Sequence, residues 1–488
     1  MLSHKVFTLL NRFSKKEMTR FVEMVDSPHF NKHRDTQQLV HYLARIYPNF
    51  DQSRCHREKL LKKLFPKHPK GQSHLALVFT YTRRLLEAFL VQEQLKEERA
   101  YHRILLLRDL RQRKCNNLYE KLLEQCIQSE QNRPTRDATY YFWQSQLAQE
   151  ADIYYTQVLE QRKKDRSLEL KEHHLDRFYM VEKLKDAVEM HIRKNILKVD
   201  YSARMLEAVL KEVRDNLDTY VQVPAIYIYF LLYQMVTRNE NPYYYEVLKL
   251  LEEHQSHFNQ ADLVNIYTYL QNYCISRINQ NDKVFLGELF KLYQAQLKRE
   301  VLIEDGYLSE WHYKNIVTTA IRLDELSWVK TFIEQYKNKL SPQAADNAYR
   351  FNLAAYYHAT GQYDKVLPLL IRVEYSDQRY NLGAKALLLR TYYELGEFEA
   401  LNSLTDSFKQ YLHRNKLMAD SRRNGYYNLF RFTRKAAQIR ANIGFVSNGK
   451  LLKDFEKLRQ DIDKAAAIFN QGWLEEKVNL LEKVVREC

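Results

Sequence analysis

The chain has 488 residues, a formal net charge of +15 and 45% apolar residues, but only 10 glycines and 9 prolines. This scarcity of turn residues favours long helices joined by short turns, and no period-2 apolar pattern bounded by turn residues indicates a sheet. The sequence therefore predicts an all-α protein and disfavours any glycine-rich phosphate-binding loop.

The apolar residues and the cysteines disfavour two further classes of protein. The most apolar stretch, 220–236, is interrupted by two glutamines and a proline and is shorter than the roughly 20 residues that span a membrane. We therefore expect a buried helix there and no membrane span. The five cysteines form no CxxC pair, and Cys115 and Cys126 would lie about 16 Å apart on a helix, too far for a disulfide. Reduced thiols and the lack of a secretory signal predict a cytoplasmic protein.

The positive charge is concentrated in two regions. Residues 1–115 contain 24 Lys or Arg against 11 Asp or Glu, and residues 413–442 contain 8 against 1. The rest of the chain carries a slight net negative charge. This distribution is compatible with acidic partners but does not identify them.

Residues 1–72 predict a basic N-terminal group of short helices. Ser14 and Glu17 have the spacing of a capping box, in which the Ser oxygen accepts a backbone N–H and the Glu side chain reaches back. Asp35 is placed to cap the helix that follows it, and a basic helix is expected over 53–65.

Residues 73–202 predict long antiparallel helices. Leu, Ile, Val and Tyr recur there at three- and four-residue spacing, which is typical of helices with one apolar face. We expect one helical tract from 74 to about 130, a turn at 133–135, and two long helices over 137–165 and 167–196.

From residue 203 onward the pattern predicts helical hairpins. Asn-rich turns at 239–242 and 279–282 separate successive pairs. Farther along, Gly361 and Gly396 occupy equivalent places in two similar segments, 35 residues apart, and Leu326 holds the same register one step earlier.

These hairpins resemble tetratricopeptide repeats, most clearly over 310–410. That family has a period near 34, a Tyr before a turn Gly and an aromatic residue two positions after it. The matching positions are Leu353, Tyr357, Gly361, Tyr363 and Leu370, and again Leu388, Tyr392, Gly396 and Phe398. The pattern departs where a small Ala is expected, at Thr331, Val366 and Leu401, and it lacks the terminal Pro. The alternative is a run of hairpins without a common ancestor. Both interpretations predict an α-solenoid over 203–488.

The resemblance implies a groove in which a partner segment lies against the first helix of each repeat. The positions that would line it are Tyr313, Ile316, Phe351, Asn352, Ala355, Ala386, Arg390 and Tyr393. Of these, Tyr313, Phe351, Asn352, Arg390 and Tyr393 are the predicted partner contacts. The Lys and Asn with which chaperone-docking members hold a C-terminal carboxylate are absent from their positions, so we do not expect that class of ligand.

Residues 444–451, "GFVSNGKL", match the glycine and lysine spacing of a P-loop. Leu451 replaces the Ser or Thr that would bind magnesium, and no strand leads into the loop. We therefore predict a turn between helices, with Gly444 ending one helix and Ser447 or Asn448 capping the next.

A partial metal-site pattern occurs over 169–191. Glu169 and His173 are four residues apart, as are Glu172 and Asp176. A dinuclear carboxylate site needs a second copy of such a motif, which is absent, and adjacent histidines point about 100° apart on a helix. We predict a solvated, salt-bridged face and no bound metal or cofactor.

The two basic regions predict a nucleic-acid surface as an alternative, because cations neutralise phosphates and aromatic rings stack on bases. Residues 54–70 hold Arg54, Arg57, Lys59, Lys62, Lys63, Lys67 and Lys70 around Glu58. Residues 413–442 interleave Arg414, Lys416, Arg422, Arg423, Arg431, Arg434, Lys435 and Arg440 with Tyr426, Tyr427, Phe430 and Phe432. The competing interpretation is that the aromatic residues are core and the charges are solvated.

No GxSxG, HExxH or GxGxxG motif occurs, so the sequence offers no catalytic constellation. We expect a non-catalytic scaffold or adaptor for an unidentified protein or peptide, without a small-molecule substrate. The alternative is a solenoid that associates with RNA or DNA through Lys59, Lys62, Lys63, Arg422, Arg423, Tyr426, Tyr427, Arg431, Arg434 and Lys435.

Overall fold

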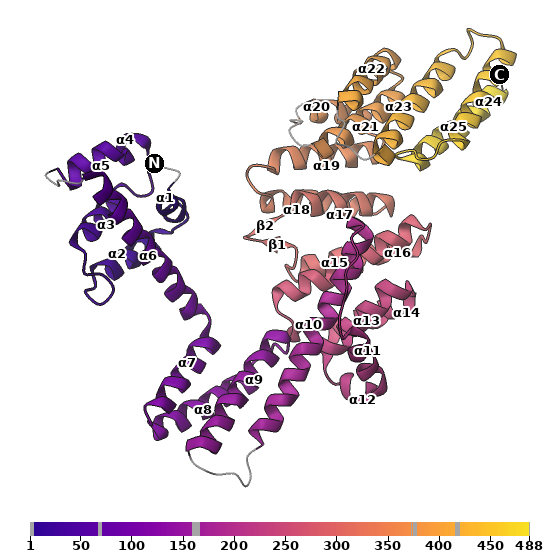
Figure 1. Ribbon diagram of the computed structural model, residues 1–488. Coiled ribbons are helices and arrows are strands. Elements are labelled where there is room, and N and C mark those ends of the chain that lie inside the picture. The colour runs from indigo at the N-terminus through magenta and orange to yellow at the C-terminus, as the bar shows by residue number, and fades with distance from the viewer. Residues whose placement is uncertain are drawn as a thin grey trace. The chain divides into compact units, whose positions relative to one another are not determined.

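The computed structural model describes residues 4–66, 71–158, 166–371, 373, 378–414 and 420–487. Over these ranges the chain is almost entirely α-helical, which confirms that the protein is all-α (Figure 1). The chain divides into two compact units. Unit 1 comprises Met1–Asn239 and Tyr245–Phe258, and unit 2 comprises Glu240–Tyr244 and Asn259–Cys488. The three-part division at residues 72 and 202 stays a prediction.

Unit 1 is built almost entirely from helices. They are α1 (Lys5–Leu10), α2 (Lys15–Asp26), α3 (Arg34–Ile46), α4 (Gln52–Cys55), α5 (Arg57–Leu64), α6 (Gly71–Glu97), α7 (Arg99–Gln112), α8 (Asn116–Gln131), α9 (Ala138–Ile153), the π-helical turn η1 (Tyr154–Val158), α10 (Ser167–Leu197), α11 (Leu206–Asp215), α12 (Leu217–Tyr220), α13 (Pro224–Arg238), most of α14 (Asn241–His254) and the 3-10 turn η2 (Gln255–His257).

Helices α1–α6 share one core, in which the rings of Phe7, Phe21 and Phe79 are fully or almost fully buried. The predicted capping box is present at the start of α2. The backbone N–H of Glu17 donates to Ser14 Oγ at 3.2 Å, and the backbone N–H of Ser14 donates to Glu17 Oε2 at 2.7 Å. Two backbone N–H groups at the start of α2, which have no partner within the helix, thereby gain side-chain acceptors.

Three local predictions for this unit are wrong. Helix α3 begins at Arg34, so Asp35 lies inside its first turn and pairs with His74 at 2.8 Å instead of capping the helix. The basic helix over 53–65 is broken at His56 into α4 and α5. The single tract from 74 to 130 is three helices, because the chain leaves helical geometry near Glu98 and Lys114.

The apolar stretch at 220–236 forms α13, whose side chains are buried on nearly all sides, as expected. Pro224 opens it, where a missing backbone N–H costs nothing, and Asn239 ends it in the left-handed conformation at φ 58°. No helix in the described ranges is long and apolar enough to cross a membrane.

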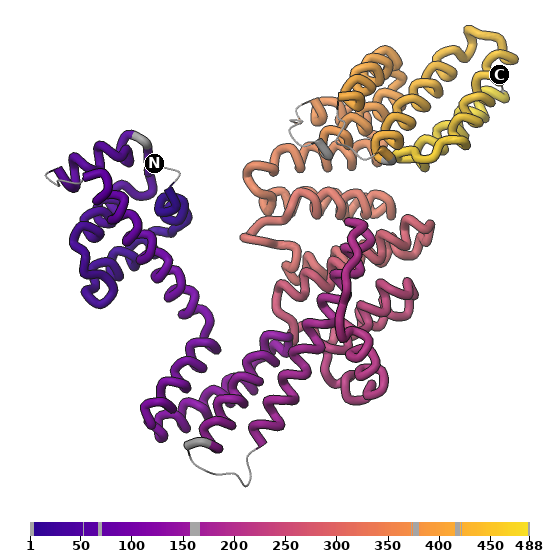
Figure 2. Tube along the Cα trace, in the orientation of Figure 1, coloured from indigo at the N-terminus to yellow at the C-terminus, as the bar shows by residue number. Residues whose placement is uncertain are grey.

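Unit 2 continues with α15 (Gln260–Asn279), α16 (Val284–Lys298), β1 (Ile303–Glu304), β2 (Tyr307–Leu308), α17 (Glu310–Arg322), α18 (Leu326–Tyr336), the 3-10 turn η3 (Lys337–Lys339), α19 (Ala345–Ala359), η4 (Tyr363–Lys365), α20 (Val366–Leu370), α21 (Gln378–Leu395), α22 (Phe398–Arg414), α23 (Asp420–Ala441), α24 (Asn448–Asp463) and α25 (Gln471–Glu487). Each helix of unit 2 lies against the helices nearest to it in sequence, so neighbouring helices have similar colours in Figure 2.

The two strands correct the prediction that no sheet forms. They pair as an antiparallel hairpin with Ile303 opposite Leu308. Asp305 and Gly306 between them both have positive φ, 51° and 83°, which is the geometry of a two-residue hairpin turn. The Asp-Gly dipeptide is the sequence signal that reveals this hairpin.

Residues in the left-handed conformation end the first helix of successive pairs. Asp324 follows α17, Gly361 follows α19, Gly396 follows α21 and Gly444 follows α23, with φ between 61° and 81°. The turn residue before α18 is therefore Asp324, and Leu326, to which the sequence pattern assigned this register, is the first residue of α18. From 324 to 361 and from 361 to 396 the turns are 37 and 35 residues apart.

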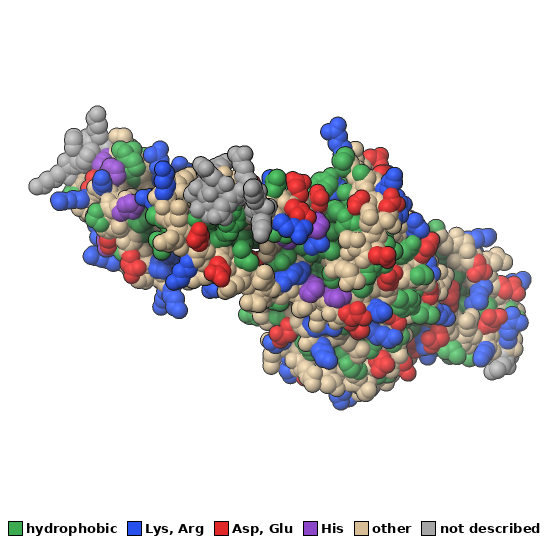
Figure 3. Space-filling view, turned by 90° about the horizontal axis from the view of Figure 1, so that it is seen from below, with side chains coloured by type: hydrophobic (Ala, Val, Ile, Leu, Met, Phe, Trp, Pro, Cys, Tyr) green, Lys and Arg blue, Asp and Glu red, His purple; other side chains and the backbone are tan. Residues whose placement is uncertain are grey.

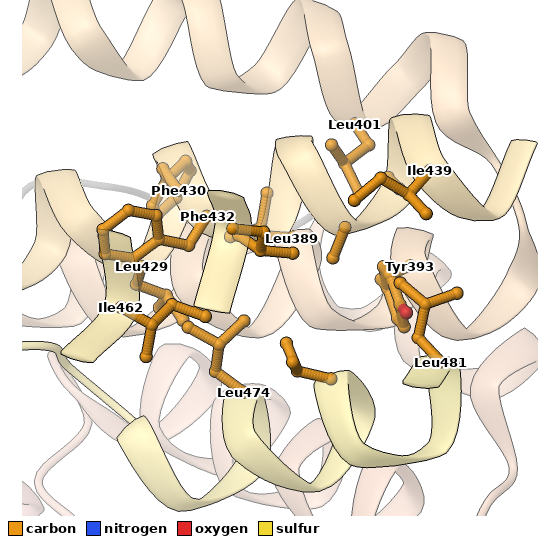
Figure 4. Packing of buried hydrophobic residues seen from close by; sticks show 14 of the residues in the cluster. Leu389, Tyr393, Leu401, Leu429, Phe430, Phe432, Ile439, Ile462, Leu474 and Leu481 are labelled. Carbon is orange, nitrogen blue, oxygen red and sulfur yellow. The ribbon is translucent and has the colours of Figure 1, made fainter. Parts of the chain in front are cut away.

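The first helices of these pairs also pack on one another, α17 on α19, α19 on α21 and α21 on α23, and α23 packs in turn on the last helix, α25. Figure 4 shows the core that results at the C-terminal end. Leu389 and Tyr393 of α21, Phe430 and Phe432 of α23, and Leu474 of α25 belong to the same buried cluster. In this C-terminal part, the apolar faces of α21 to α25 therefore share one core.

Replacing Gly396 with Ala tests the left-handed turns. At φ 75° an added Cβ is strained even though nothing lies near it, so we expect a loss of about 1 kcal/mol in the free energy of unfolding. Gly449 is the matched control, since it lies inside α24 in open space, and Ala there should stabilise the protein by up to about 1 kcal/mol. Urea unfolding followed by circular dichroism measures both; a larger loss at Gly449 than at Gly396 would contradict the assignment.

Candidate functional site

A cleft of about 450 Å³ runs across α17, α19 and α21, each of which is the first helix of a helical pair in unit 2. Lys314 comes from α17, Phe351 from α19 and Arg390 from α21. The opposite wall is formed by the start of α25, with Trp473 and Lys477. Residues separated by more than 150 positions in sequence therefore meet around one cavity.

The structure separates the predicted groove residues into two groups. Phe351, Ala355 and Arg390 line the cleft. Tyr313, Asn352 and Tyr393 are instead buried beneath it, together with Ile316 and Ala386. Three of the eight predicted groove residues thus line the cleft, and the other five point into the core.

The buried members of the predicted set have packing and hydrogen-bonding roles. The Tyr313 hydroxyl donates to the Ile333 carbonyl at 2.9 Å, which ties α17 to α18. Asn352 Nδ2 donates to the carbonyl of Ala348, one turn back, at 2.8 Å. The ring of Tyr393 meets the Trp473 ring edge-on, with 5.6 Å between their centroids, so it supports the wall of the cleft from behind.

Glu394 holds α25 against α21. It accepts a hydrogen bond from Trp473 Nε1 at 3.1 Å and pairs with Lys477 Nζ at 3.0 Å. Lys477 also pairs with Glu476 at 3.0 Å. Burial lowers the pKa of the Lys477 ammonium group, but the hydrogen bonds that it donates to these two carboxylates outweigh burial and raise that pKa. Two helices far apart in sequence are thereby joined at the edge of the cleft.

The loop between α24 and α25 is fastened to α23 close to the same cleft. The backbone N–H of Phe469 donates to the Gly425 carbonyl at 3.0 Å, and Asn428 Nδ2 donates to the Ala467 carbonyl at 2.9 Å. The Phe469 ring stacks on Tyr426 with centroids 4.1 Å apart. These contacts fix the position from which Phe469 and Trp473 reach the cleft.

Arg390 is a mostly covered guanidinium at the floor of the cleft. Its Nε has no hydrogen-bond partner among the described residues, and its Cζ lies 5.9 Å from the centre of the Trp473 ring. Burial lowers the pKa of the guanidinium to about 10, a shift that the charge of Glu394 opposes. Arg390 therefore remains a cation at neutral pH.

His358, on the neighbouring helix α19, is buried and lines the same cleft. Burial, followed by the charges of Arg390 and Lys477, lowers the pKa of its imidazole to about 3. The ring is therefore uncharged at neutral pH, and its Nε2 has no hydrogen-bond partner among the described residues.

An aromatic cluster forms the other end of the cleft. Lys314 Nζ lies 5.1 Å from the centre of the Phe351 ring and 5.3 Å from that of Tyr380. Phe351 meets Tyr380 edge-on at 5.3 Å. Gly383 lies directly beside this cluster, where a Cβ would come within 3.2 Å of the Phe351 ring. The cleft thus combines apolar walls with positive charge.

The P-loop-like segment at 444–451 is a turn between helices, as predicted. Gly444 follows α23 at φ 81°, and α24 begins at Asn448, so the lysine of the motif is already inside a helix. The predicted side-chain cap does not form: Ser447 occupies the N-cap position without a cap hydrogen bond, and Asn448 Oδ1 has no partner among the described residues.

The partial metal pattern lies on α10 as a charged face. Glu169 pairs with Arg166 at 2.8 Å, and His173 is exposed. His174 is partly buried against Tyr141, and burial lowers the pKa of its imidazole to about 4. In the described part of the chain, no group of three or more His, Cys, Asp or Glu is arranged to hold a metal ion.

The basic region at 413–442 borders a groove between α22 and α23. Two adjoining hollows of about 280 and 560 Å³ share Lys409 and Tyr427. The predicted nucleic-acid residues that line them are Arg423, Tyr427, Arg431, Arg434 and Lys435. Tyr427 is exposed, whereas Tyr426 is buried together with Phe430 and Phe432. Of the four aromatic residues in this region, Tyr427 is thus the one whose ring is open to a stacking partner.

Acidic side chains neutralise much of this groove. Arg434 pairs with Asp406 at 2.6 Å, while Arg431 and Lys435 both approach Asp461, at 3.3 and 2.5 Å. On the face drawn in Figure 3, Lys and Arg side chains are likewise interspersed with Asp and Glu side chains.

The N-terminal basic region lies in the other unit. Lys59, Lys62 and Lys63 are exposed on α5, and Lys63 Nζ lies 4.7 Å from the centre of the Tyr42 ring. Arg422 is exposed on α23. Lys67, Lys70 and Lys416 lie outside the described residues.

The sequence did not indicate that Glu394, Trp473, Lys477 and His358 belong to the cleft. The contacts of Glu394 with Trp473 and Lys477 join residues 79 and 83 positions apart, and no local sequence pattern indicates them. A scan against protein-family models found no match for this chain, and searches of curated proteins and of solved structures found none either.

His358 makes stability depend on pH. In the unfolded chain its imidazole titrates near 6.5 and in the folded chain near 3, so falling pH protonates the unfolded form first. Stability should therefore fall between about pH 6.5 and pH 3. His358→Gln should make that slope shallower by up to about 1.4 kcal/mol per pH unit. Urea unfolding at pH 7, 6 and 5 measures the difference, and equal slopes in the two proteins would contradict the buried, neutral state.

Proposed function

We propose that this chain is a non-catalytic scaffold or adaptor that binds a segment of another protein in the cleft across α17, α19 and α21. The observation that carries the proposal is the cleft itself, because it lies on the first helices of successive hairpins, where the tetratricopeptide resemblance places a partner. Phe351, Ala355 and Arg390 were assigned to this surface from sequence and line it.

The packing of unit 2 supports an α-solenoid as the framework of this function. Helical hairpins that bury their faces only on neighbouring hairpins form extended arrays, and such arrays present a continuous binding surface along one set of helices. In unit 2 the first helices of the hairpins pack in the order α17, α19, α21 and α23, and the last helix, α25, packs on α23. The tetratricopeptide-like assignment of 310–410 belongs to the same proposal.

The composition of the cleft favours a peptide as its occupant. Its walls are aromatic and apolar at Phe351 and Trp473, and a few polar groups, such as Arg390 and His358, converge on its floor. Peptide grooves take their affinity from apolar anchors and their specificity from a small number of polar contacts.

Filling the cleft tests this function. Ala355→Arg places a long side chain on its surface, so proteins that co-purify with the wild-type chain from nuclease-treated extract of its native cell should be lost. Ala441→Arg, at the exposed end of α23, is the matched control and should retain them. Circular dichroism of both variants checks that they fold. Equal recovery with the two variants would contradict binding in the cleft.

A second candidate function, association with RNA or DNA, rests on the groove between α22 and α23. Five residues predicted for it from sequence line this one groove, and Tyr427 presents an exposed ring among them. The ion pairs with Asp406 and Asp461 weaken the candidate, since phosphates would have to displace those acids.

Binding of a fluorescent single-stranded RNA, measured against salt concentration, tests this candidate. Tyr427→Ala should remove a stacking contact worth about 1–3 kcal/mol. Arg423→Gln should weaken binding and reduce the salt slope by about one. Arg350→Gln, on α19 away from this groove, should leave binding unchanged. RNA affinity that neither groove substitution alters would exclude the groove as the site.

A further inference from the structure

The charges around the cleft are unequally distributed. Glu394 and Glu476 are the acidic residues that line it, and Lys477 pairs with both at 3.0 Å. Arg390 has no ion pair in the described part of the chain, although Glu394 lies one turn farther along the same helix. The cleft therefore contains the guanidinium of Arg390, while the nearby carboxylate of Glu394 is paired with Lys477.

A covered guanidinium without an ion-pair partner costs the folded protein free energy when no ligand is bound. A covered charged group loses hydration, and an ion or hydrogen-bond partner normally compensates for that loss. Among the described residues, Arg390 forms no ion pair and its Nε has no hydrogen-bond partner, although the charge of Glu394 offsets part of the effect of burial. Its Cζ lies 5.9 Å from the centre of the Trp473 ring. A ligand that brings an anion into the cleft would supply the missing acceptor.

The geometry points to an acidic residue of the partner segment as that acceptor. We propose that an Asp or Glu of the bound peptide pairs with the Arg390 guanidinium, while flanking apolar residues of the peptide contact Phe351 and Trp473. This inference rests on the proposed function and specifies the chemistry of the partner. A planar guanidinium can donate two parallel hydrogen bonds to one carboxylate. Such a pair adds affinity and also fixes the orientation of the bound peptide.

The neighbouring groups favour a single carboxylate over a polyanion. Glu394 and Glu476 line the cleft, so a chain of phosphates entering it would meet negative charge beside the cation. The buried, uncharged ring of His358 adds one further polar contact without adding positive charge. The apolar area around Phe351 also suits side chains that a nucleic-acid backbone does not carry.

Selection from a random peptide library displayed on phage tests the inference with the full-length chain. Peptides enriched on the wild-type protein over the Ala355→Arg protein should contain Asp or Glu at a fixed position beside apolar residues. A fluorescein-labelled representative is then measured by fluorescence polarisation. Arg390→Gln should weaken its binding at least about tenfold, and replacing the acidic residue of the peptide by its amide should do the same.

Two variants make the assignment specific to Arg390. Arg390→Lys keeps the charge but loses the fork, so its affinity should lie between those of the wild type and Arg390→Gln. Arg350→Gln, on α19 outside the cleft, is the control and should bind as the wild type does. Combining Arg390→Gln with the amide peptide should cost little more than either change alone, because both remove one interaction.

Different failures have different meanings. Enriched peptides without a fixed acidic residue, or equal binding by Arg390→Gln, would overturn this inference and leave the proposed function standing. Failure to enrich any peptide over the Ala355→Arg protein would contradict the proposed function and the inference together. Displacement of the peptide by single-stranded RNA, with RNA binding lost in Arg390→Gln, would assign the cation to nucleic acid instead.

Discussion

The carboxylate of Glu394 joins α21 to α25 and thereby defines the cleft. It accepts from Trp473 Nε1 and pairs with Lys477 across 79 and 83 positions of sequence. Apart from that attachment, α25 is positioned by its apolar face, by a hydrogen bond from Arg459 of α24 to Asn479, and by the loop that precedes it. With the contacts of Glu394, the first turn of α25 becomes a wall, and the surface of α17, α19 and α21 is closed along one side.

This attachment has an electrostatic consequence for the helix that carries it. Lys477 pairs with Glu394, whereas the nearby guanidinium of Arg390 forms no ion pair with any of the described residues. The cleft that this interaction completes therefore has a covered positive charge at its floor. Packing, ion pairing and the chemistry of the expected ligand are linked through one glutamate.

The sequence predicted what depends on local patterns. Helical periodicity, the Ser14–Glu17 capping box and the turn glycines 361, 396 and 444 were correctly assigned, because each is determined within a few residues. Asp35 was misplaced because its partner, His74, is 39 residues away. Long-range partners such as Glu394 and Lys477 have no local signal. Periodicity also identifies a helix face, but it does not show which residues of that face are buried and which line a cleft. Tyr313 and Phe351 were therefore both predicted as partner contacts, although only Phe351 lines the cleft.

The cleft as a partner-binding surface is most directly tested by site-specific photocrosslinking in the native cell. A photoreactive amino acid at Thr318, an exposed residue that lines the cleft, should form a discrete crosslinked protein adduct. The same amino acid at Glu399, exposed on α22 and outside the cleft lining, should not. An adduct that forms equally at both positions, or only at Glu399, would contradict the account.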